Sequence, residues 1–185
     1  MLRNTVYCWG TPAKLLHWGM VVLILVQIGL GLIAANWPVS PLKLELFFWH
    51  KSIGMLIVLF VLIRLLWRAC NPTPVLPEGT PGWERIAARS THLLLYLLML
   101  ALPLTGWIVN SASNIPFRIF WLIPLPAIVA PDKLTADLFA LVHRGLFVMI
   151  TVILTVHIGA ALWHHFVKRN NVLVRMLPGR RSPHE

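Results

Sequence analysis

Charged residues are scarce in this sequence. Only 12% of its 185 residues are charged, while 58% are hydrophobic and the mean hydropathy is +0.76; a soluble domain carries about 25% charged residues. This composition excludes a soluble enzyme and a disordered chain, because both need more polar residues to face water. Cysteine is scarce too, and Cys8 and Cys70 belong to no Cys-x-x-Cys motif, which argues against a disulfide framework, covalent haem and thiolate metal clusters. We therefore expect an integral membrane protein.

Four apolar stretches are long enough to cross a bilayer, whose core requires about 20 helical residues. They cover approximately residues 15–35, 46–67, 86–109 and 138–166. Thr11 and Pro12 are interpreted as the N-cap and the first helical residue before the first stretch. Residues 69–85 are too rich in Pro and Gly for a helix, and the long connection 110–137 is a candidate for a membrane-surface segment. Residues 1–185 are thus predicted to form a single all-α domain, an integral membrane four-helix bundle.

The distribution of basic residues predicts the orientation of this bundle. Eleven of the sixteen Lys and Arg residues lie on the side of both termini and the 69–85 connection, and five lie on the other side. The positive-inside rule then places both termini in the cytoplasm. The net charge of +10 is read as this topological signal and not as nucleic-acid binding, and Arg175, Arg180 and Arg181 are expected to touch anionic lipid headgroups. The five residues of the opposite side are Lys43, Lys51, Arg118, Lys133 and Arg144.

Histidine is the most informative residue type. All eight histidines except His184 lie in or at the ends of the apolar stretches, where ionisable side chains are functional candidates; a structural role is the alternative for any one alone. Depth sorts four of them into two pairs, His50 with His143 toward the outside and His17 with His157 toward the cytoplasm. The fourteen residues from His143 to His157 correspond to a rise of about 21 Å and a rotation of about 40°, so both face the bundle interior.

Two imidazoles at each of two depths suit two six-coordinate haems, because the porphyrin supplies the other four ligands of each iron. A closed zinc site needs more protein ligands. Only Glu45 and Asp137 lie near the outer pair, and no acidic residue matches the depth of the inner pair. Two non-covalent haem groups are therefore predicted, with His92 as the chief rival of His17 for the inner iron.

Basic side chains near the four histidines are candidate partners of haem propionates. Lys51 and Arg144 directly follow the two outer histidines, and Arg64 lies at the depth of the inner pair. Arginine binds carboxylates bidentately in a low-dielectric setting. Snorkelling to the membrane interface explains Lys51 better and explains Arg64 and Arg144 equally well.

Two further histidines follow the inner pair near the cytoplasmic end. His164 lies seven residues after His157, on nearly the same helix face and about 10 Å nearer the cytoplasm. It is a candidate to bind an inner propionate or to line a quinone site, and an interfacial role explains it equally well. His165 points to another face and is not a site candidate.

Several motifs together resemble the bacterial cytochrome b561 family. They are Leu15-Leu16-His17-Trp18, His50-Lys51-Ser52-Ile53-Gly54, the 61–68 segment ending in Trp67-Arg68, His92 with Leu95-Tyr96, Ala101-Leu102-Pro103, and His157-Ile158-Gly159 with Trp163-His164-His165-Phe166. The match extends over nearly the whole chain. The resemblance implies a four-helix protein of the bacterial inner membrane with two haem b groups, ligated by His17, His50, His143 and His157.

The same resemblance implies electron transfer between a periplasmic donor and the ubiquinone of the membrane. In at least one relative the reaction resembles superoxide oxidation coupled to ubiquinone reduction, so a quinone oxidoreductase of this type is the leading hypothesis. A haem-containing membrane anchor subunit of a soluble dehydrogenase or hydrogenase is the alternative. A haem-free transporter with a histidine proton relay fits less well, because its histidines would not need to sort into two depths.

Overall fold

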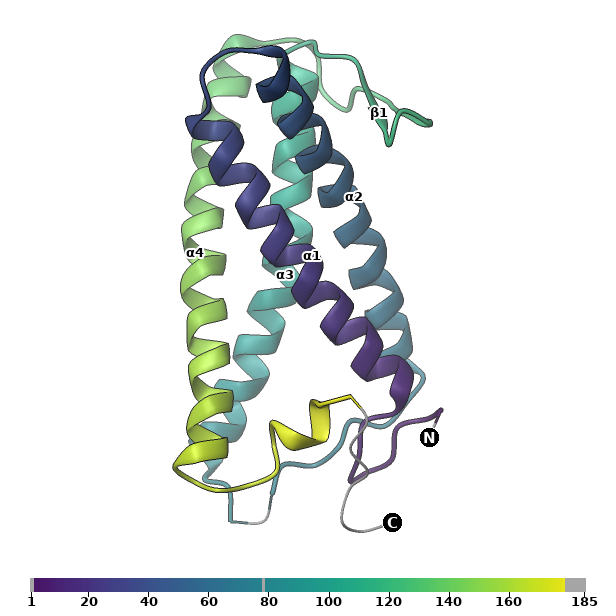
Figure 1. Cartoon of the computed structure of the whole chain (residues 1–185), viewed down its shortest axis with the longest axis vertical. Coiled ribbons are helices and arrows are strands. Elements are labelled where there is room, and N and C mark those ends of the chain that lie inside the picture. Colours follow the sequence, from purple (N-terminus) through teal and green to yellow (C-terminus); the bar gives the residue numbers. More distant parts are fainter. Residues whose placement is uncertain (1, 78, 179–185) are drawn as a thin grey trace.

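Four long helices make up most of the structure, a computed structural model that describes residues 2–77 and 79–178 (Figure 1). The helices are α1 (Thr11–Asn36), α2 (Pro41–Ala69), α3 (Gly82–Ala112) and α4 (Lys133–Phe166). All four are long and apolar enough to span a membrane, which confirms the predicted four-helix membrane bundle. Each predicted stretch lies within one helix. Three residues discussed above, Arg180, Arg181 and His184, lie outside the described residues.

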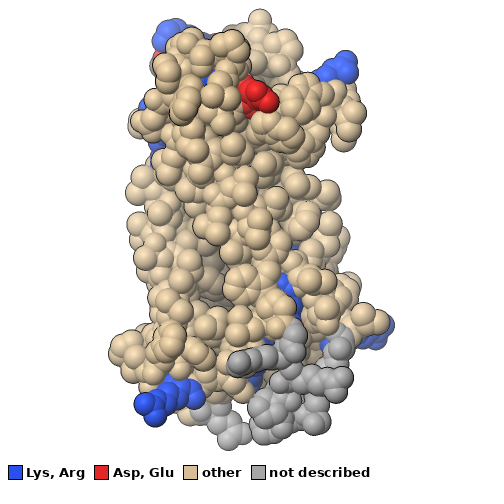
Figure 2. Space-filling model, in the orientation of Figure 1, with Lys and Arg blue, Asp and Glu red and all other residues tan. Residues whose placement is uncertain are grey.

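The helices pack in chain order. α1 packs on α2, α2 on α3 and α3 on α4, whereas α4 makes few close backbone approaches to α1 or α2. The start of α1, the 70–81 connection and the end of α4 share one end of the bundle, called the terminal end here; the opposite end is called the loop end (Figure 1). Lys and Arg gather toward both ends of the face in Figure 2, and the belt between them consists mainly of uncharged residues, as expected for a protein whose middle faces lipid.

The apolar core occupies the middle of the bundle. Ile150 of α4 is 4% exposed and lies seven residues from both His143 and His157. The other buried members of this central cluster come from all three remaining helices: Met20, Ile57, Val61, Leu95, Leu98 and Met99. The cluster therefore separates the depth of His143 from the depth of His157.

Local hydrogen bonds fix where the helices begin. The Ser40 hydroxyl accepts a hydrogen bond from the amide of Lys43 at the start of α2. The Asp132 carboxylate accepts one from the amide of Thr135 at the start of α4, as N-cap residues do. The hydroxyl and amide of Thr135 hold the pKa of the Asp132 carboxyl below its usual value. At α1 the N-cap is Gly10 and not the predicted Thr11.

Gly10 takes the N-cap position of α1 because its backbone lies directly against the N-terminal segment. A Cβ on Gly10 would lie 2.8 Å from the backbone carbon of Arg3. The amide of Gly10 donates to the side-chain oxygen of Asn4 at 2.9 Å. Contact with the preceding segment, and not a capping side chain, therefore determines the start of this helix.

A short hairpin lies beside α2 at the loop end (Figure 1). Strands β1 (Phe117–Ile119) and β2 (Ile123–Leu125) pair antiparallel. The Trp121 ring stacks on Phe48 of α2, with ring centres 3.6 Å apart, and the Phe120 amide donates to the buried Ser52 hydroxyl. The hairpin thus follows α2 down to the depth of His50, which is two residues before Ser52 in the helix.

Candidate functional site

His50 of α2 and His143 of α4 form the outer histidine pair, in the half of the bundle nearer the loop end. Their ring centres are 6.3 Å apart and the ring planes are inclined by 72°. His50 Nδ1 lies 3.2 Å from the backbone oxygen of Gln27 in α1. Because a carbonyl can only accept, Nδ1 of His50 carries the ring hydrogen and Nε2 keeps a free lone pair. Such a contact fixes the tautomer and orientation of a metal-binding histidine.

The same logic applies to His143 through a side chain of α3. His143 Nδ1 lies 2.9 Å from the Thr105 hydroxyl oxygen, and that hydroxyl donates its hydrogen to the Leu102 carbonyl at 2.8 Å. The hydroxyl can therefore only accept from His143, so Nδ1 of His143 is the donor and its Nε2 is free. Both outer imidazoles therefore leave Nε2 available to a metal ion.

Two glycines make room for the outer rings. A Cβ on Gly31 would lie 2.8 Å from Cε1 of His50, and one on Gly106 would lie 3.5 Å from Cε1 of His143. A side chain at Gly31 would thus displace the His50 ring. Sequence reasoning missed Gly31, Gln27 and Thr105; the only signal was a polar Gln or Thr within an apolar stretch.

The inner level brings three histidines together. The ring centres of His17 in α1 and His157 in α4 are 6.3 Å apart, with planes inclined by 73°. His92 of α3 is closer still, with its ring centre 5.4 Å from that of His157. The predicted partner and its predicted rival therefore both reach His157.

Arg64 of α2 lies within this inner group. One of its terminal nitrogens, Nη1, is 2.9 Å from Nδ1 of His17, and its Nε donates to the Tyr96 hydroxyl at 3.0 Å. The depth expected for Arg64 from the sequence thus agrees with its position beside the inner pair. Tyr96 was quoted only as part of a motif, and its contact with Arg64 depends on the packing of α2 against α3.

The spacing of both pairs fits axial ligation of an iron porphyrin. An imidazole nitrogen binds a metal at about 2.0 Å and lies about 1.1 Å from its ring centre, so two rings on opposite sides of one metal have centres about 6.2 Å apart. Both pairs are at 6.3 Å. In each pair one ring belongs to α4 and the other to α1 or α2. α4 makes few close backbone approaches to either of these two helices.

The two basic residues next to the outer pair differ in their surroundings. Lys51 donates to the Asn110 side chain at 2.7 Å and lies over the Phe117 ring, 5.4 Å from its centre. It therefore links α2 to α3 and to the hairpin. Arg144 is exposed, on the helix that carries His143.

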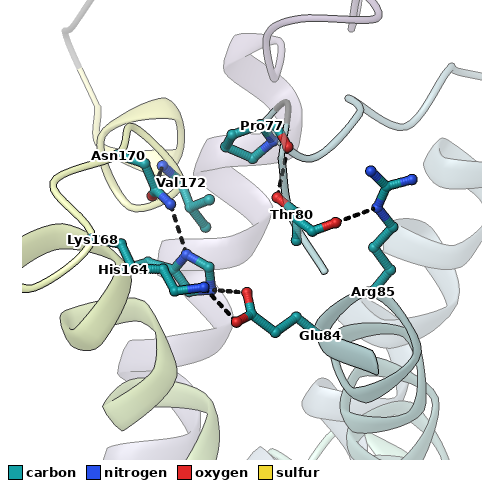
Figure 3. A network of polar contacts seen from close by, with 8 residues as sticks. All are labelled: Pro77, Thr80, Glu84, Arg85, His164, Lys168, Asn170 and Val172. Atoms are coloured by element: carbon teal, nitrogen blue, oxygen red, sulfur yellow. Dashed lines mark hydrogen bonds and ion pairs between the residues drawn. The ribbon is translucent and has the colours of Figure 1, made fainter. Parts of the chain in front are cut away.

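His164 lies in a polar network at the terminal end (Figure 3). The Asn170 amide donates to Nδ1 of His164 at 2.8 Å, so Nε2 carries the ring hydrogen; it faces Glu84 of α3 at 3.7 Å. Lys168 also contacts the Glu84 carboxylate. Glu84 is only 11% exposed in its side chain, and sequence reasoning missed it. His165 instead packs its ring on Phe166.

An apolar four-helix bundle with paired histidines between its helices is an arrangement that suits bound haem. The family model of prokaryotic cytochrome b561 matches residues 8–179. The chain belongs to this family, whose members are membrane electron-transfer proteins that contain haem b.

Individual relatives agree with this assignment. The chain is 33% identical over 180 residues to cytochrome b561 homolog 2 of Escherichia coli strain K12, which covers 94% of this chain and 93% of the relative. It is 29% identical over 134 residues to cytochrome b561 homolog 1 of the same strain, covering 71% and 74%. It is 31% identical over 134 residues to the probable superoxide oxidase CybB of Yersinia pestis, covering 72% and 75%.

Proposed function

We propose that the chain conducts electrons across the bacterial inner membrane through two haem b groups, with both of its termini in the cytoplasm. His50 and His143 hold the outer haem, and His17 and His157 hold the inner one. The observation that supports this most directly is the equal 6.3 Å spacing of the two ring pairs. The orientation rests on the eleven basic residues on the terminal side against five on the other.

The residues around the haems determine their environment. Haem iron supplies the one-electron chemistry when it is bound. Gln27 and Thr105 keep Nε2 of the outer histidines free, while Arg64 offers the inner level a positive charge for a propionate. The central cluster around Ile150 keeps water out of the space between the two depths, where a low dielectric strengthens these electrostatic contacts.

The electron donor in this proposal is superoxide from the periplasm. The name of the Yersinia pestis relative supports this choice, as do the basic residues at the loop end, among them exposed Arg144, because positive charge attracts an anionic substrate. Two superoxide anions lose one electron each to give two O₂. Ubiquinone accepts the two electrons and two protons to give ubiquinol.

Ubiquinone reduction is assigned to the terminal end, near the inner haem. The network of His164, Glu84, Lys168 and Asn170 supports this assignment, because it places proton-exchanging groups in contact with one another where two protons are needed. His164 and Glu84 are partly shielded from solvent, with side chains 16% and 11% exposed.

Haem content and superoxide kinetics test this function. Protein expressed with sufficient haem is expected to contain two haem b per chain by the pyridine haemochrome method. Stopped-flow mixing with superoxide should reduce the haem, and added ubiquinone should reoxidise it. His157→Ala should lose the inner haem, while the control His165→Ala keeps both.

The possible results separate three conclusions. Fewer than two haems in the native chain would refute the two-haem proposal. Haem that stays oxidised with superoxide would refute the donor but not electron transfer. Stoichiometric recovery of a dehydrogenase or hydrogenase subunit from mild detergent would favour the alternative of a membrane anchor.

A further inference from the structure

The two histidine levels differ in the charge of the groups that contact their rings. At the inner level, Nη1 of Arg64 lies 2.9 Å from Nδ1 of His17, so a guanidinium, which stays charged in proteins, contacts a proposed ligand. Among the described residues, the ion pairs of Asp and Glu involve other cations and not Arg64. None of these residues therefore neutralises the positive charge at the inner level.

At the outer level, the groups that contact the rings are neutral. The backbone oxygen of Gln27 lies 3.2 Å from Nδ1 of His50, and the Thr105 hydroxyl oxygen lies 2.9 Å from Nδ1 of His143. Lys51 is near this level, but its ammonium donates to a side-chain amide of α3 and lies over an aromatic ring, and neither partner is a histidine. Acceptors at Nδ1 increase the electron donation of an imidazole to a metal, which favours the oxidised metal.

Two further contacts hold the guanidinium of Arg64 inside the bundle. Its Nε donates to the Tyr96 hydroxyl of α3 at 3.0 Å, and its Nη1 lies 3.9 Å from Sδ of Met20, which is 3% exposed and belongs to the central cluster. A histidine that binds iron through Nε2 carries its hydrogen on Nδ1 and cannot accept there, so the terminal nitrogens of Arg64 are then available to a haem propionate. The bond from Nε to Tyr96 does not depend on that exchange and keeps the charge at the inner depth.

We propose that Arg64, positioned by Tyr96, makes the inner haem the stronger electron acceptor of the two. This rests on the proposed two-haem function. A nearby positive charge stabilises the form of a haem that has gained an electron, and it acts more strongly in the low dielectric of the bundle interior than in water. The electron that the inner site gains is the one that the outer site loses. Electrons therefore collect at the terminal end, where the proposed reduction of ubiquinone needs them.

The reduction potentials of the two haems test this order. A spectroscopic redox titration of the purified holoprotein should show two one-electron steps, and His157→Ala should lose the step of the inner haem, which identifies it. The inner step is expected at the higher potential. An inner step at an equal or lower potential would overturn the proposal, although the two-haem function would stand. Fewer than two haems in the unsubstituted chain would refute that function instead.

Two substitutions of Arg64 separate its charge from its shape. Arg64→Gln removes the charge and should shift the equilibrium distribution of an electron about tenfold toward the outer haem, which corresponds to a fall of about 59 mV in the inner potential. Arg64→Lys keeps the charge and should retain most of the native difference. The control Arg3→Gln removes an exposed arginine at the same end of the bundle and should change neither step. If Arg64→Gln leaves the inner potential unchanged, or lowers both steps equally, the proposal is wrong.

Tyr96→Phe tests the positioning role without removing a charge. It keeps the ring but lacks the hydroxyl that accepts from Arg64, so the inner potential should fall by less than in Arg64→Gln, with both haems retained. Because this substitution is mild, it also tests the proposal if Arg64→Gln cannot hold the inner haem. Tyr7→Phe is the matched control, since Tyr7 is the other tyrosine of the chain and is exposed.

A double variant shows whether Tyr96 acts through Arg64. In the Arg64→Gln background, Tyr96→Phe should cause no further fall of the inner potential, because the charge that it positions is gone. A fall of the same size in both backgrounds would show that Tyr96 acts independently of Arg64, and an unchanged potential in Tyr96→Phe alone would show that it does not act at all. Either result would overturn the assigned role of Tyr96.

Discussion

Thr105 is the residue whose replacement most directly tests the outer site. Its hydroxyl accepts from His143 Nδ1 at 2.9 Å while it donates to the Leu102 carbonyl. Thr105→Val keeps the shape of the side chain and removes the acceptor. An acceptor at Nδ1 makes the imidazole a stronger electron donor, which favours ferric iron. The substitution should therefore raise the reduction potential of the outer haem.

The size of this effect follows from the strength of one hydrogen bond. A net contribution of about 0.5–1.5 kcal/mol corresponds to about 20–65 mV for a one-electron couple. We therefore expect a shift within that range.

A spectroscopic redox titration of purified protein measures this shift. The inner haem should keep its potential, because the central cluster separates the two levels. Thr151→Val is the matched control: the Thr151 hydroxyl bonds the Phe147 carbonyl of its own helix and is exposed. An unchanged outer potential in Thr105→Val, or an equal shift in Thr151→Val, would refute the assigned role of Thr105.

Three further predictions address other parts of the molecule. Gly31→Ala should displace the His50 ring, because the added Cβ would lie 2.8 Å from Cε1 of that ring. Haem analysis of this variant should show one haem per chain. The control Gly29→Ala, whose added Cβ would meet open space, should retain two. His164→Gln should slow haem reoxidation by ubiquinone in stopped flow but leave reduction by superoxide unchanged, and equal effects on both steps would contradict the assigned quinone region. A fluorophore on Leu122→Cys at the hairpin tip, with the two native cysteines replaced by serine, should be shielded from an aqueous quencher in vesicles. The same label on Val39→Cys, where the native side chain is 94% exposed, should be quenched, and equal quenching would place the hairpin in water.

Much of the bundle follows from the sequence because the bilayer restricts it. Apolar length predicted the four helices, and the helix repeat predicted that His143 and His157 share a face. His17 and His157 were predicted to lie at the same depth because successive spans cross the membrane in opposite directions. These features depend on the helix repeat and on depth in the membrane, both of which can be read from a single sequence.

The features that sequence reasoning missed depend on contacts between helices. The hydrogen bond from Arg64 to the Tyr96 hydroxyl depends on how α3 packs against α2, which no spacing along the chain encodes. The hairpin is another case. Phe120 and Trp121 have φ angles of 48° and 62°, which disfavour bulky residues; their contacts with Ser52 and Phe48 stabilise this backbone.

Both histidine pairs share α4, which links the two levels mechanically. The opposing rings belong to different helices, α2 at the outer level and α1 at the inner one, so a shift of either would affect one histidine pair. A rotation or sliding of α4 would change the geometry of both pairs at once. One residue inserted between His143 and His157 would turn the second ring by about 100°, so that α4 could serve one level or the other but no longer both.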